Sequence, residues 1–347
     1  MESYVWHLAH QLLRLGVSIG ARSLDEVIGR ADLLSQVSRG SDHLDDLDLN
    51  PLLIRVDGSD DIVYDRNKPR NAVPDTLDAE IVRDAARFLE DGEKMQLSYA
   101  VQNTHRTVGT RTSSHIVSKF GMRNALQPNH LTVKLTGSAG QSLGAFAAPG
   151  LKLEVSGDAN DYVGKGLSGG TIVVRPPMMS PLVAANNTII GNTVLYGATD
   201  GYLFAAGRAG ERFAVRNSGA KVVVEGCGSN GCEYMTGGVA VILGDIGANF
   251  GAGMTGGMAY LYDPEGKAQA LMNMESLVTC PVTVDHWVDQ LKGLIERHVD
   301  ETMSRKAQDI LQHWDIELAN FVQVCPKEML DKISHPLGIE KTAVPAE

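Results

Sequence analysis

Two segments of the sequence have the glycine spacing of a loop that could bind a dinucleotide. Residues 164–169 and 251–256 both match G-x-G-x-x-G. A dinucleotide site needs that loop to follow a strand and to open a helix, because the N-terminus of the helix holds the pyrophosphate. Here TIVVRPP and MAYLYD follow the two loops, and both segments are typical of strands. The two matches therefore predict corners between strands and no cofactor-binding residues.

A serine in a nucleophile-elbow pattern offers a second possible chemistry. Residues 140–144 fit G-x-S-x-G, with Ser142 at the centre. In hydrolases this elbow leads into a helix that holds the serine on a strained turn. The segment AFAAPG follows instead, with Pro149 and no helix start, so we expect no catalytic serine here.

A basic cluster in NTHRTVGTR allows two interpretations. His105, Arg106 and Arg111 could together face an anion. Alternatively, they could tie this segment to the first coil of the following structure through hydrogen bonds and ion pairs. The second interpretation is favoured.

An acidic corner in GDANDYVGKG could suggest a cation site. Asp158, Asn160 and Asp161 supply too few oxygen ligands, and their spacing differs from that of an EF-hand. Asn and Asp are common in turns because they tolerate a left-handed backbone and form Asx turns. We therefore expect turns here and at three other corners, which contain Asn192, Asn217 and Asn249.

The cysteines show no pattern of reactive or metal-binding residues. None forms a CxxC pair, and no cluster of Cys and His has a metal-ligand spacing. We expect reduced thiols at Cys227, Cys232, Cys280 and Cys325. The sequence thus predicts no catalytic, cofactor-binding or metal-binding residue in this chain.

A repeat underlies these motifs. A small residue precedes an apolar run at positions 150, 170, 201, 220, 238 and 257, with spacings of 20, 31, 19, 18 and 19 residues. One short strand and a tight turn cannot bury a face alone but can do so when stacked on neighbours. The repeat predicts a mainly β solenoid, a β-helix with one coil per repeat, in which Pro176, Pro177 and Pro181 mark an insertion.

Helices are expected on both sides of this solenoid. Ser23 and Glu26 form a capping-box pattern, and Asp78 is expected to cap a helix that Gly92 ends. The expected helices cover residues 4–15, 24–30, 78–90, 113–120, 286–301 and 304–321, and strands begin near Lys94 and Leu131. The last two helices are interpreted as a cap over the open end of the solenoid or as a docking arm.

The expected domains follow from these elements. Residues 1–37 form a helical segment, residues 38–93 an acidic linker and helix, residues 94–270 the solenoid, and residues 271–347 a helical arm and tail.

Charge and hydropathy exclude some partners. The formal net charge of −11 argues against nucleic acid and anionic membranes, which attract clustered Lys and Arg. No apolar run approaches the roughly 18 residues that a membrane span needs, and the first residues lack the features of a signal peptide. We expect a soluble, cytoplasmic protein.

Several long segments resemble one known domain. They are QNTHRTVGTR, LTGSAGQSLGAFAAPGLKLEVSGDANDYVGKGLSGGTIVVRP, the stretch from IIGNTVLYG to GGVAVILG, and NFGAGMTGGMAYLYD. They closely resemble the C-terminal GXGXG domain of the large (alpha) subunit of bacterial glutamate synthase, over residues 21–329. The resemblance implies a right-handed, single-stranded β-helix. ARSLDEVIGRADLL resembles the end of the preceding FMN-binding synthase domain.

The resemblance also implies a function and partners. In that family the β-helix has no catalytic residues and braces an amidotransferase domain against an FMN-binding synthase domain with an iron–sulfur cluster. The whole enzyme converts glutamine and 2-oxoglutarate to two glutamates, and NADPH acts through a small (beta) subunit. The domains that carry this chemistry are missing from the present sequence, so its own enzymatic activity stays uncertain.

One alternative remains open. The chain could be the β-helical subunit of another glutamate synthase-like or formylmethanofuran dehydrogenase-like oxidoreductase. A site of its own would then be sought near Arg106 and Arg111 or at the corner from Asp158 to Asp161.

Overall fold

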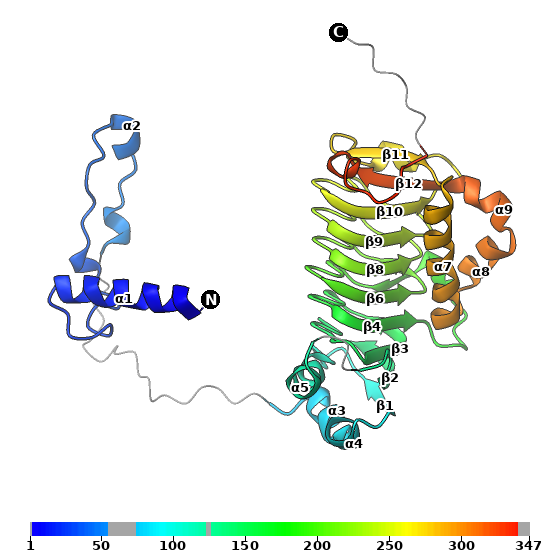
Figure 1. Ribbon diagram of the computed structural model, residues 1–347, viewed down its shortest axis with the longest axis horizontal. Coiled ribbons are helices and arrows are strands. Elements are labelled where there is room, and N and C mark those ends of the chain that lie inside the picture. The colour runs from blue at the N-terminus through cyan, green and yellow to red at the C-terminus, as the bar shows by residue number, and fades with distance from the viewer. Residues whose placement is uncertain (1, 55–73, 123–125, 339–347) are drawn as a thin grey trace, which may run out of the picture. The chain divides into compact units, whose positions relative to one another are not determined.

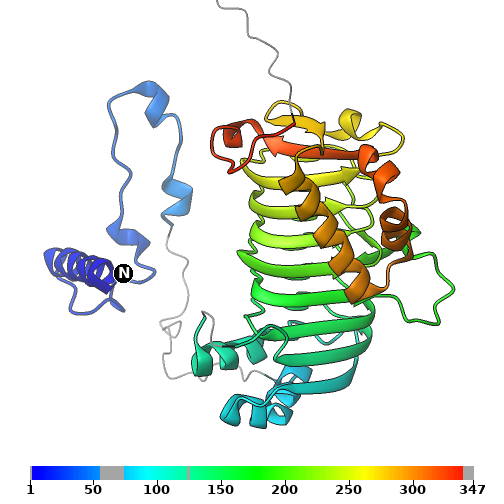
Figure 2. The same cartoon turned by 45° about the vertical axis from the view of Figure 1, so that its right-hand side comes forward.

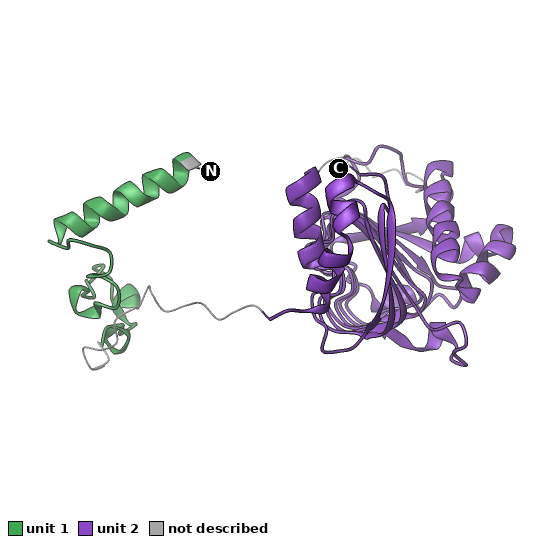
Figure 3. Cartoon of the chain, turned by 90° about the horizontal axis from the view of Figure 1, so that it is seen from below, with its two compact units in different colours: residues 1–73 green, residues 74–347 purple. Residues whose placement is uncertain are grey.

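The computed structural model describes residues 2–54, 74–122 and 126–338. Contacts between residues divide the chain into two compact units, residues 1–73 and residues 74–347 (Figure 3). Each unit is described by itself below.

The described residues of the first unit form one long helix and several short ones, without a buried core. It contains α1 (Glu2–Ser18), η1 (Ala31–Leu33), α2 (Asp42–Asp45) and η2 (Asn50–Leu52). The helix expected over residues 4–15 is confirmed, and no residue from 3 to 54 is buried. The prediction of a helix after Ser23 is wrong. Glu26 accepts hydrogen bonds from the amide and side chain of Arg22, and the segment forms turns instead.

The second unit begins with α3 (Leu77–Asp84), α4 (Ala86–Asp91), β1 (Met95–Val101) and α5 (Thr110–Phe120). Gly92 ends α4 in a left-handed conformation, as expected. The prediction that Asp78 caps its own helix, α3, is wrong. Its carboxylate accepts hydrogen bonds from the Arg111 and Thr112 amides at 2.6 and 3.3 Å, and so caps the start of α5.

A mixed sheet of twelve strands forms most of the second unit (Figure 1). The strands from β1 through β10 along its main path are parallel, and β1, β2 and β3 pair residue for residue without a shift. The parallel strands after β1 are β2 (Leu131–Ala139), β3 (Leu151–Ala159), β4 (Ser168–Arg175), β6 (Asp200–Ala205), β8 (Ser218–Val224), β9 (Thr236–Ile242) and β10 (Gly256–Tyr262). The six strands from β3 to β10 in this list are the ones that the small-residue repeat predicts, and β2 begins at Leu131, where a separate strand is expected.

The predicted insertion lies between β4 and β6. It holds the three prolines, η3 (Ala184–Asn186) and β5 (Thr188–Ile190). β5 lies off the main path of the sheet and pairs with β3 and with β7 (Arg208–Ala209). The insertion thus returns the chain to the sheet before the repeat resumes.

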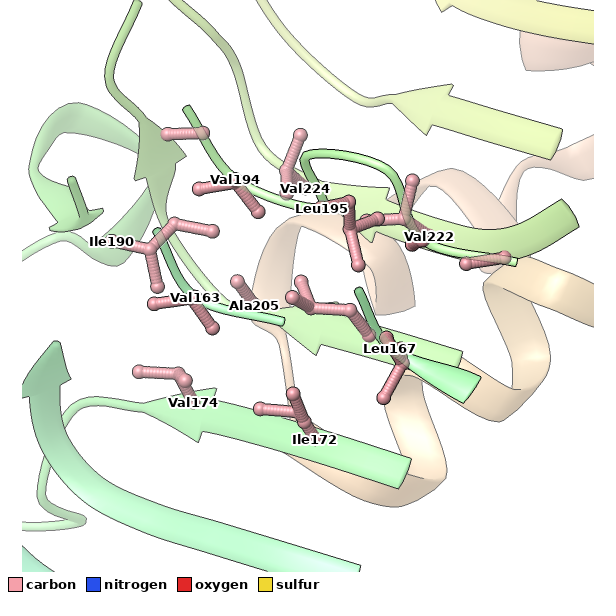
Figure 4. Packing of buried hydrophobic residues seen from close by; sticks show 14 of the residues in the cluster. Val163, Leu167, Ile172, Val174, Ile190, Val194, Leu195, Ala205, Val222 and Val224 are labelled. Carbon is pink, nitrogen blue, oxygen red and sulfur yellow. The ribbon is translucent and has the colours of Figure 1, made fainter. Parts of the chain in front are cut away.

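The principal core lies on the inner side of the parallel strands. In β2 and β3 buried and partly exposed residues alternate, because successive side chains of a strand point to opposite faces. Figure 4 shows apolar side chains from strands and from the segments between them meeting in this core, among them Leu167, Ile172, Leu195 and Val222. Three helices of the second unit contribute to the same core: Ile81 comes from α3, Phe88 from α4 and Ile116 from α5.

A helix, α7 (Asp285–Thr302), covers the other face of the sheet (Figure 2). It packs Trp287, Leu291 and Ile295 against a second apolar cluster that includes Phe204 and Tyr260. After α7 come α8 (Arg305–Gln312), α9 (Trp314–Glu317) and η4 (Leu318–Asn320). The expected helix over 304–321 is therefore broken into three pieces.

The end of the sheet is covered by strands, so the expected helical cap is wrong. β12 (Phe321–Pro326) pairs antiparallel with β10, and β11 (Leu277–Pro281) pairs with β12. These strands satisfy the backbone groups of the β10 edge and leave the helices free to cover a face. Two short helices flank these strands in sequence, α6 (Ala268–Leu271) and η5 (Lys327–Met329).

Candidate functional site

The glycine motifs lie in three of six segments that share an unusual alternating backbone, and we call these six segments the corner segments. In each of them, three residues at alternate positions have φ between 53° and 72°. Their positions are 142, 144 and 146; 162, 164 and 166; 193, 195 and 197; 212, 214 and 216; 230, 232 and 234; and 249, 251 and 253. Most of these left-handed residues are not glycine, so the geometry extends well beyond the glycine motifs.

The corner segments stack through backbone hydrogen bonds. The Gly164 amide donates to the Leu143 carbonyl at 2.8 Å, and the Gly251 amide donates to the Gly231 carbonyl at 2.8 Å. The amides of residues 195, 214 and 232 donate equivalent hydrogen bonds to the carbonyls of residues 163, 194 and 213, respectively. These amides face neighbouring segments, so they cannot also bind a phosphate. β4 and β10 follow the two G-x-G-x-x-G segments, as expected for corners.

Ser142 is a corner residue. Its backbone is left-handed, and its amide donates to the Asp161 carbonyl at 2.9 Å. Turns and β3 follow it instead of a helix. The geometry differs from a nucleophile elbow, in which the serine leads directly into a helix.

Polar side chains at the acidic corner bind one another and the neighbouring backbone. Ser138 donates to Asp158 at 3.0 Å, Asn160 donates to Asn103 at 2.8 Å, and the Asn192 amide donates to Asp161 at 2.8 Å. A shallow cavity of about 250 Å³ lies beside Asp158 and Asn160. Among the described residues, no group of three or more Cys, His, Asp or Glu side chains is arranged to hold a metal ion.

The other predicted asparagines also stabilise corners. Asn217 is buried, and its side chain binds the backbone of Gly219 and Ala220. The Asn192 side chain accepts from the Glu211 amide at 2.8 Å. Asn249 has a left-handed backbone, and its side chain bonds to those of Asn230 and Asn273.

The segment around His105 is tied to the stack through its backbone. The Gly140 amide donates to the His105 carbonyl at 3.2 Å, and the Thr107 amide donates to the Gln141 carbonyl at 2.9 Å. The expected hydrogen-bonded connection is therefore confirmed. Within the described part of the chain, neither Arg106 nor Arg111 forms an ion pair, so the expected ion pairs are not found.

A larger cavity, for which the sequence carries no signal, lies between the insertion and α8. Its volume is about 920 Å³, and it is lined by Pro176, Leu182, Glu225, Ser304 and Lys306 among others. Glu225 is 1% exposed at the end of β8. Burial lowers the pKa of Lys306, and the nearby carboxylates of Glu225 and Asp245 partly oppose this effect.

Glu225 links a serine and a histidine at this cavity. It accepts a hydrogen bond from the Ser304 hydroxyl, and its Oε1 lies 3.8 Å from Nε2 of the buried His298. In a hydrolytic triad the histidine lies between the serine and the acid. Here the acid lies between the other two, so the arrangement joins β8 to α7 and α8 without activating a nucleophile. Sequence spacing gave no signal for it, because the three residues come from distant segments.

The cysteine thiols are buried and poorly suited to nucleophilic chemistry. All four are free. Burial raises the pKa of the Cys227 thiol to about 12 and that of Cys325 to about 11, and it also raises the pKa of Cys232 and Cys280. A thiolate is the reactive form, so these thiols are largely unreactive at neutral pH.

Among the described residues, no helix is both long and apolar enough to cross a membrane.

Comparison with known proteins identifies the family. The family model described as "GXGXG motif" matches residues 78–327. The chain is 63% identical over 340 residues to the glutamate synthase [NADPH] large chain of Azospirillum brasilense, covering 98% of this chain and 22% of that protein. It is 41% identical to the glutamate synthase [NADPH] large chain of Bacillus subtilis, covering 94% of this chain and 21% of that protein.

A ferredoxin-dependent relative gives the same result. The chain is 42% identical to ferredoxin-dependent glutamate synthase 2 of Synechocystis sp., covering 95% of this chain and 21% of that protein. The chain thus spans about one fifth of the length of these relatives. The match covers most of the chain and includes the corner segments, and the chain therefore belongs to the GXGXG motif family.

Proposed function

We propose that this chain is a structural module of a glutamate synthase. The observation that carries the proposal is the 63% identity to a glutamate synthase large chain across 98% of this sequence. The module would brace the amidotransferase domain against the FMN-binding synthase domain. The complete assembly would form two glutamates from glutamine, 2-oxoglutarate and a reductant.

The fold assigned to this module is a right-handed, single-stranded β-helix. The stacked parallel strands and the backbone ladder between corner segments support it. Residues 94–270 would form the solenoid, and residues 271–347 a helical arm and tail. Residues 1–37 would end the FMN-binding domain, and residues 38–93 would link it to the solenoid. Residues 55–73 and 339–347 of these predicted domains lie outside the described residues.

A bracing role without catalysis agrees with the chemistry of the described residues. Burial holds the thiols in their protonated form, and the serine–acid–histidine arrangement at Glu225 has the wrong order for a triad. The first unit also leaves large apolar side chains in water, including Trp6 at 62% and Ile28 at 62% exposure. Exposed apolar surface of this extent is typical of a protein–protein interface.

The cofactors of such an assembly would lie on its other domains. The amides of the glycine-rich loops bond within the stack, and no metal-binding cluster occurs among the described residues, so these residues do not fit FMN phosphate or an iron–sulfur cluster. NADPH would act through a small subunit that this module touches only indirectly. Four free cysteines agree with a reducing compartment such as the cytoplasm.

A chimera tests the proposal. In it, this chain replaces the matching one fifth of the Azospirillum large chain. The chimera is purified with its small subunit and assayed for glutamate formation from glutamine and 2-oxoglutarate. Activity close to that of the natural enzyme is expected, whereas a folded chimera without activity would contradict the proposal. The control is the same large chain with the matching segment deleted, which we expect to be inactive.

A further inference from the structure

The cavity between the insertion and α8 contains a buried carboxylate with unused hydrogen-bonding capacity. Glu225 lines this cavity directly after β8 and is almost inaccessible to solvent. Its Oε1 accepts the hydrogen bond from Ser304, whereas its Oε2 has no hydrogen-bond partner among the described residues. A buried polar atom without a partner is costly, and such atoms are few in native proteins. Glu225 is therefore placed to bind a hydrogen-bond donor that enters the cavity.

A lysine of the same cavity lies close to Glu225. A Cβ atom at Gly244 would lie 3.1 Å from Nζ of Lys306 and 3.2 Å from the carbonyl carbon of Glu225, so the ammonium lies beside the backbone of Glu225. Within the described part of the chain, Lys306 forms no hydrogen bond and no ion pair, and its Nζ lies 5.8 Å from the centre of the Tyr262 ring. Lys306 is therefore placed to bind an anionic group.

The other ionisable side chains that line the cavity are exposed or already bonded. Three of them are exposed to solvent, namely Arg305, Asp309 and His313. The fourth, Glu317, accepts hydrogen bonds from the Tyr262 hydroxyl at 2.6 Å and from the Asn320 side chain at 2.8 Å. The buried carboxylate and the lysine thus remain as one negative and one positive group that a ligand can engage.

Apolar side chains supply the rest of the lining. Leu182 and Val183 of the insertion line the cavity and are 60% and 63% exposed, and the buried Ile310 lines it from α8. Sites for small molecules typically have volumes of about 300–1,000 Å³ and combine an apolar lining with a few precisely placed polar groups. The cavity, with a volume of about 920 Å³, has both properties.

The two charged groups narrow the class of ligand. A simple cation would be attracted to Glu225 but repelled by Lys306, and a simple anion would be attracted to Lys306 but repelled by Glu225. A zwitterion gives each group an opposite charge, and hydrogen bonds between charged groups are the strong ones. A free amino acid carries an ammonium, a carboxylate and a side chain, which match the carboxylate, the lysine and the apolar lining.

We propose that this cavity binds a free amino acid with an apolar side chain. Its ammonium donates a hydrogen bond to Oε2 of Glu225, and its carboxylate binds the Lys306 ammonium. Its side chain lies against Leu182 and Val183, so the ligand joins the insertion to α8. The site is formed by this chain alone and does not depend on the proposed bracing role, so either proposal can fail without the other.

Calorimetric titration of the 347-residue chain with three matched compounds tests the site. The compounds are L-leucine, isocaproate, which is leucine without its amino group, and isoamylamine, which is leucine without its carboxylate. We expect L-leucine to bind with a Kd of about 1 mM or below. We expect the other two to bind at least about tenfold more weakly, because each lacks one charged contact. Absence of leucine binding, or equal affinity for either truncated compound, would overturn the proposal.

Two substitutions test the residues that hold the ligand. Glu225→Gln keeps an acceptor for Ser304 but replaces the other oxygen by an amide donor, and Lys306→Met removes the charge. Each is expected to weaken leucine binding at least about tenfold. The matched control is Lys292→Met, which removes the same charge from α7 outside the cavity lining and should leave the affinity unchanged.

The outcomes for these variants are decisive even if one of them does not fold. Circular dichroism shows whether Glu225→Gln is folded, and if it is not, Lys306→Met and the three compounds decide. Unchanged affinity in Lys306→Met, or an equal loss in Lys292→Met, contradicts the proposal.

Hydrogen exchange places the bound ligand in the structure. With saturating L-leucine, we expect slower amide exchange in peptides that cover residues 178–185 and 302–310, because the ligand holds these two segments together. Exchange in the corner segment at residues 142–146 should not change. Protection of other segments without protection of these two would contradict the proposed site.

Discussion

The hydroxyl of Ser304 donates a hydrogen bond to the carboxylate of Glu225, 79 residues away in the sequence. The same hydroxyl accepts a hydrogen bond from the Ala307 amide at 3.0 Å and thereby caps α8. Both side chains are nearly inaccessible to water. This contact joins the end of β8 to the junction between α7 and α8, and it holds the helical layer on the sheet.

Removal of this hydroxyl should loosen the helical layer. We expect Ser304→Ala to lower the free energy of unfolding by about 2–3 kcal/mol, because it removes a helix cap and a hydrogen bond to a buried charge. Ser304→Thr keeps the hydroxyl and should retain most of the stability. Urea unfolding followed by circular dichroism measures both values. Equal losses for Ala and Thr would show that the hydroxyl is not the stabilising group.

The Asp78 carboxylate should stabilise the helix that it caps from outside. Asp78→Ala leaves the first amides of α5 and the buried Thr112 hydroxyl without their acceptor. We expect a loss of about 2–3 kcal/mol in the free energy of unfolding. Asp75→Ala is the control, because the Asp75 side chain is 82% exposed and only weakly paired with Arg83. A loss for Asp75→Ala as large as that for Asp78→Ala would contradict the capping role.

Two corner glycines should respond differently to the same substitution. Gly166 and Gly197 have φ of 64° and 66°, so alanine at either position costs about 1–2 kcal/mol of backbone strain. A Cβ atom at Gly197 meets nothing within 4 Å, whereas one at Gly166 collides with the Phe146 ring. We therefore expect Gly166→Ala to be the more destabilising in thermal and urea unfolding. The opposite order would show that the ring does not rest on Gly166.

Buried thiols should make the folded state sensitive to alkali. The pKa of Cys227 is raised by burial from 9.0 to about 12, so the unfolded chain releases this proton first. The thiol's contribution to stability is complete below pH 9 and is lost as the pH rises from 9 to 12, at about 1.4 kcal/mol per pH unit. Urea unfolding at pH 8, 9 and 10 should show this decline, and Cys227→Ala should reduce its slope. An unchanged slope in Cys227→Ala would contradict burial of this thiol in the folded state.

The sequence predicts the strands well because their physical signal is local. A small residue followed by an apolar run recurs at each coil, and proline marks the insertion that interrupts the repeat. The structure places strands at all six predicted runs. The failed helical predictions have local explanations too: Glu26 binds Arg22 instead of completing a box with Ser23, and Asp78 finds the amides of another helix.

The candidate sites are less predictable because they depend on contacts across the fold. Glu225, His298 and Ser304 meet only when α7 and α8 pack on the sheet, and no spacing in the sequence reports that packing. Phe146, Arg216 and Tyr234 have a left-handed backbone although none of them is a glycine, so the sequence does not reveal this conformation. The stacking of the corner segments imposes it. β11 and β12 also lie outside the repeat, because β12 pairs with β10 and β11 across the helices that separate them in the sequence.

In the function proposed here, this chain braces a glutamate synthase whose chemistry lies on other domains. The most direct test measures glutamate formation from glutamine and 2-oxoglutarate, with added FMN and NADPH, for the isolated chain and for the full-length chimera side by side. We expect no activity above background in the isolated chain and restored activity in the chimera. Turnover by the isolated chain, or a folded chimera that makes no glutamate, would contradict it.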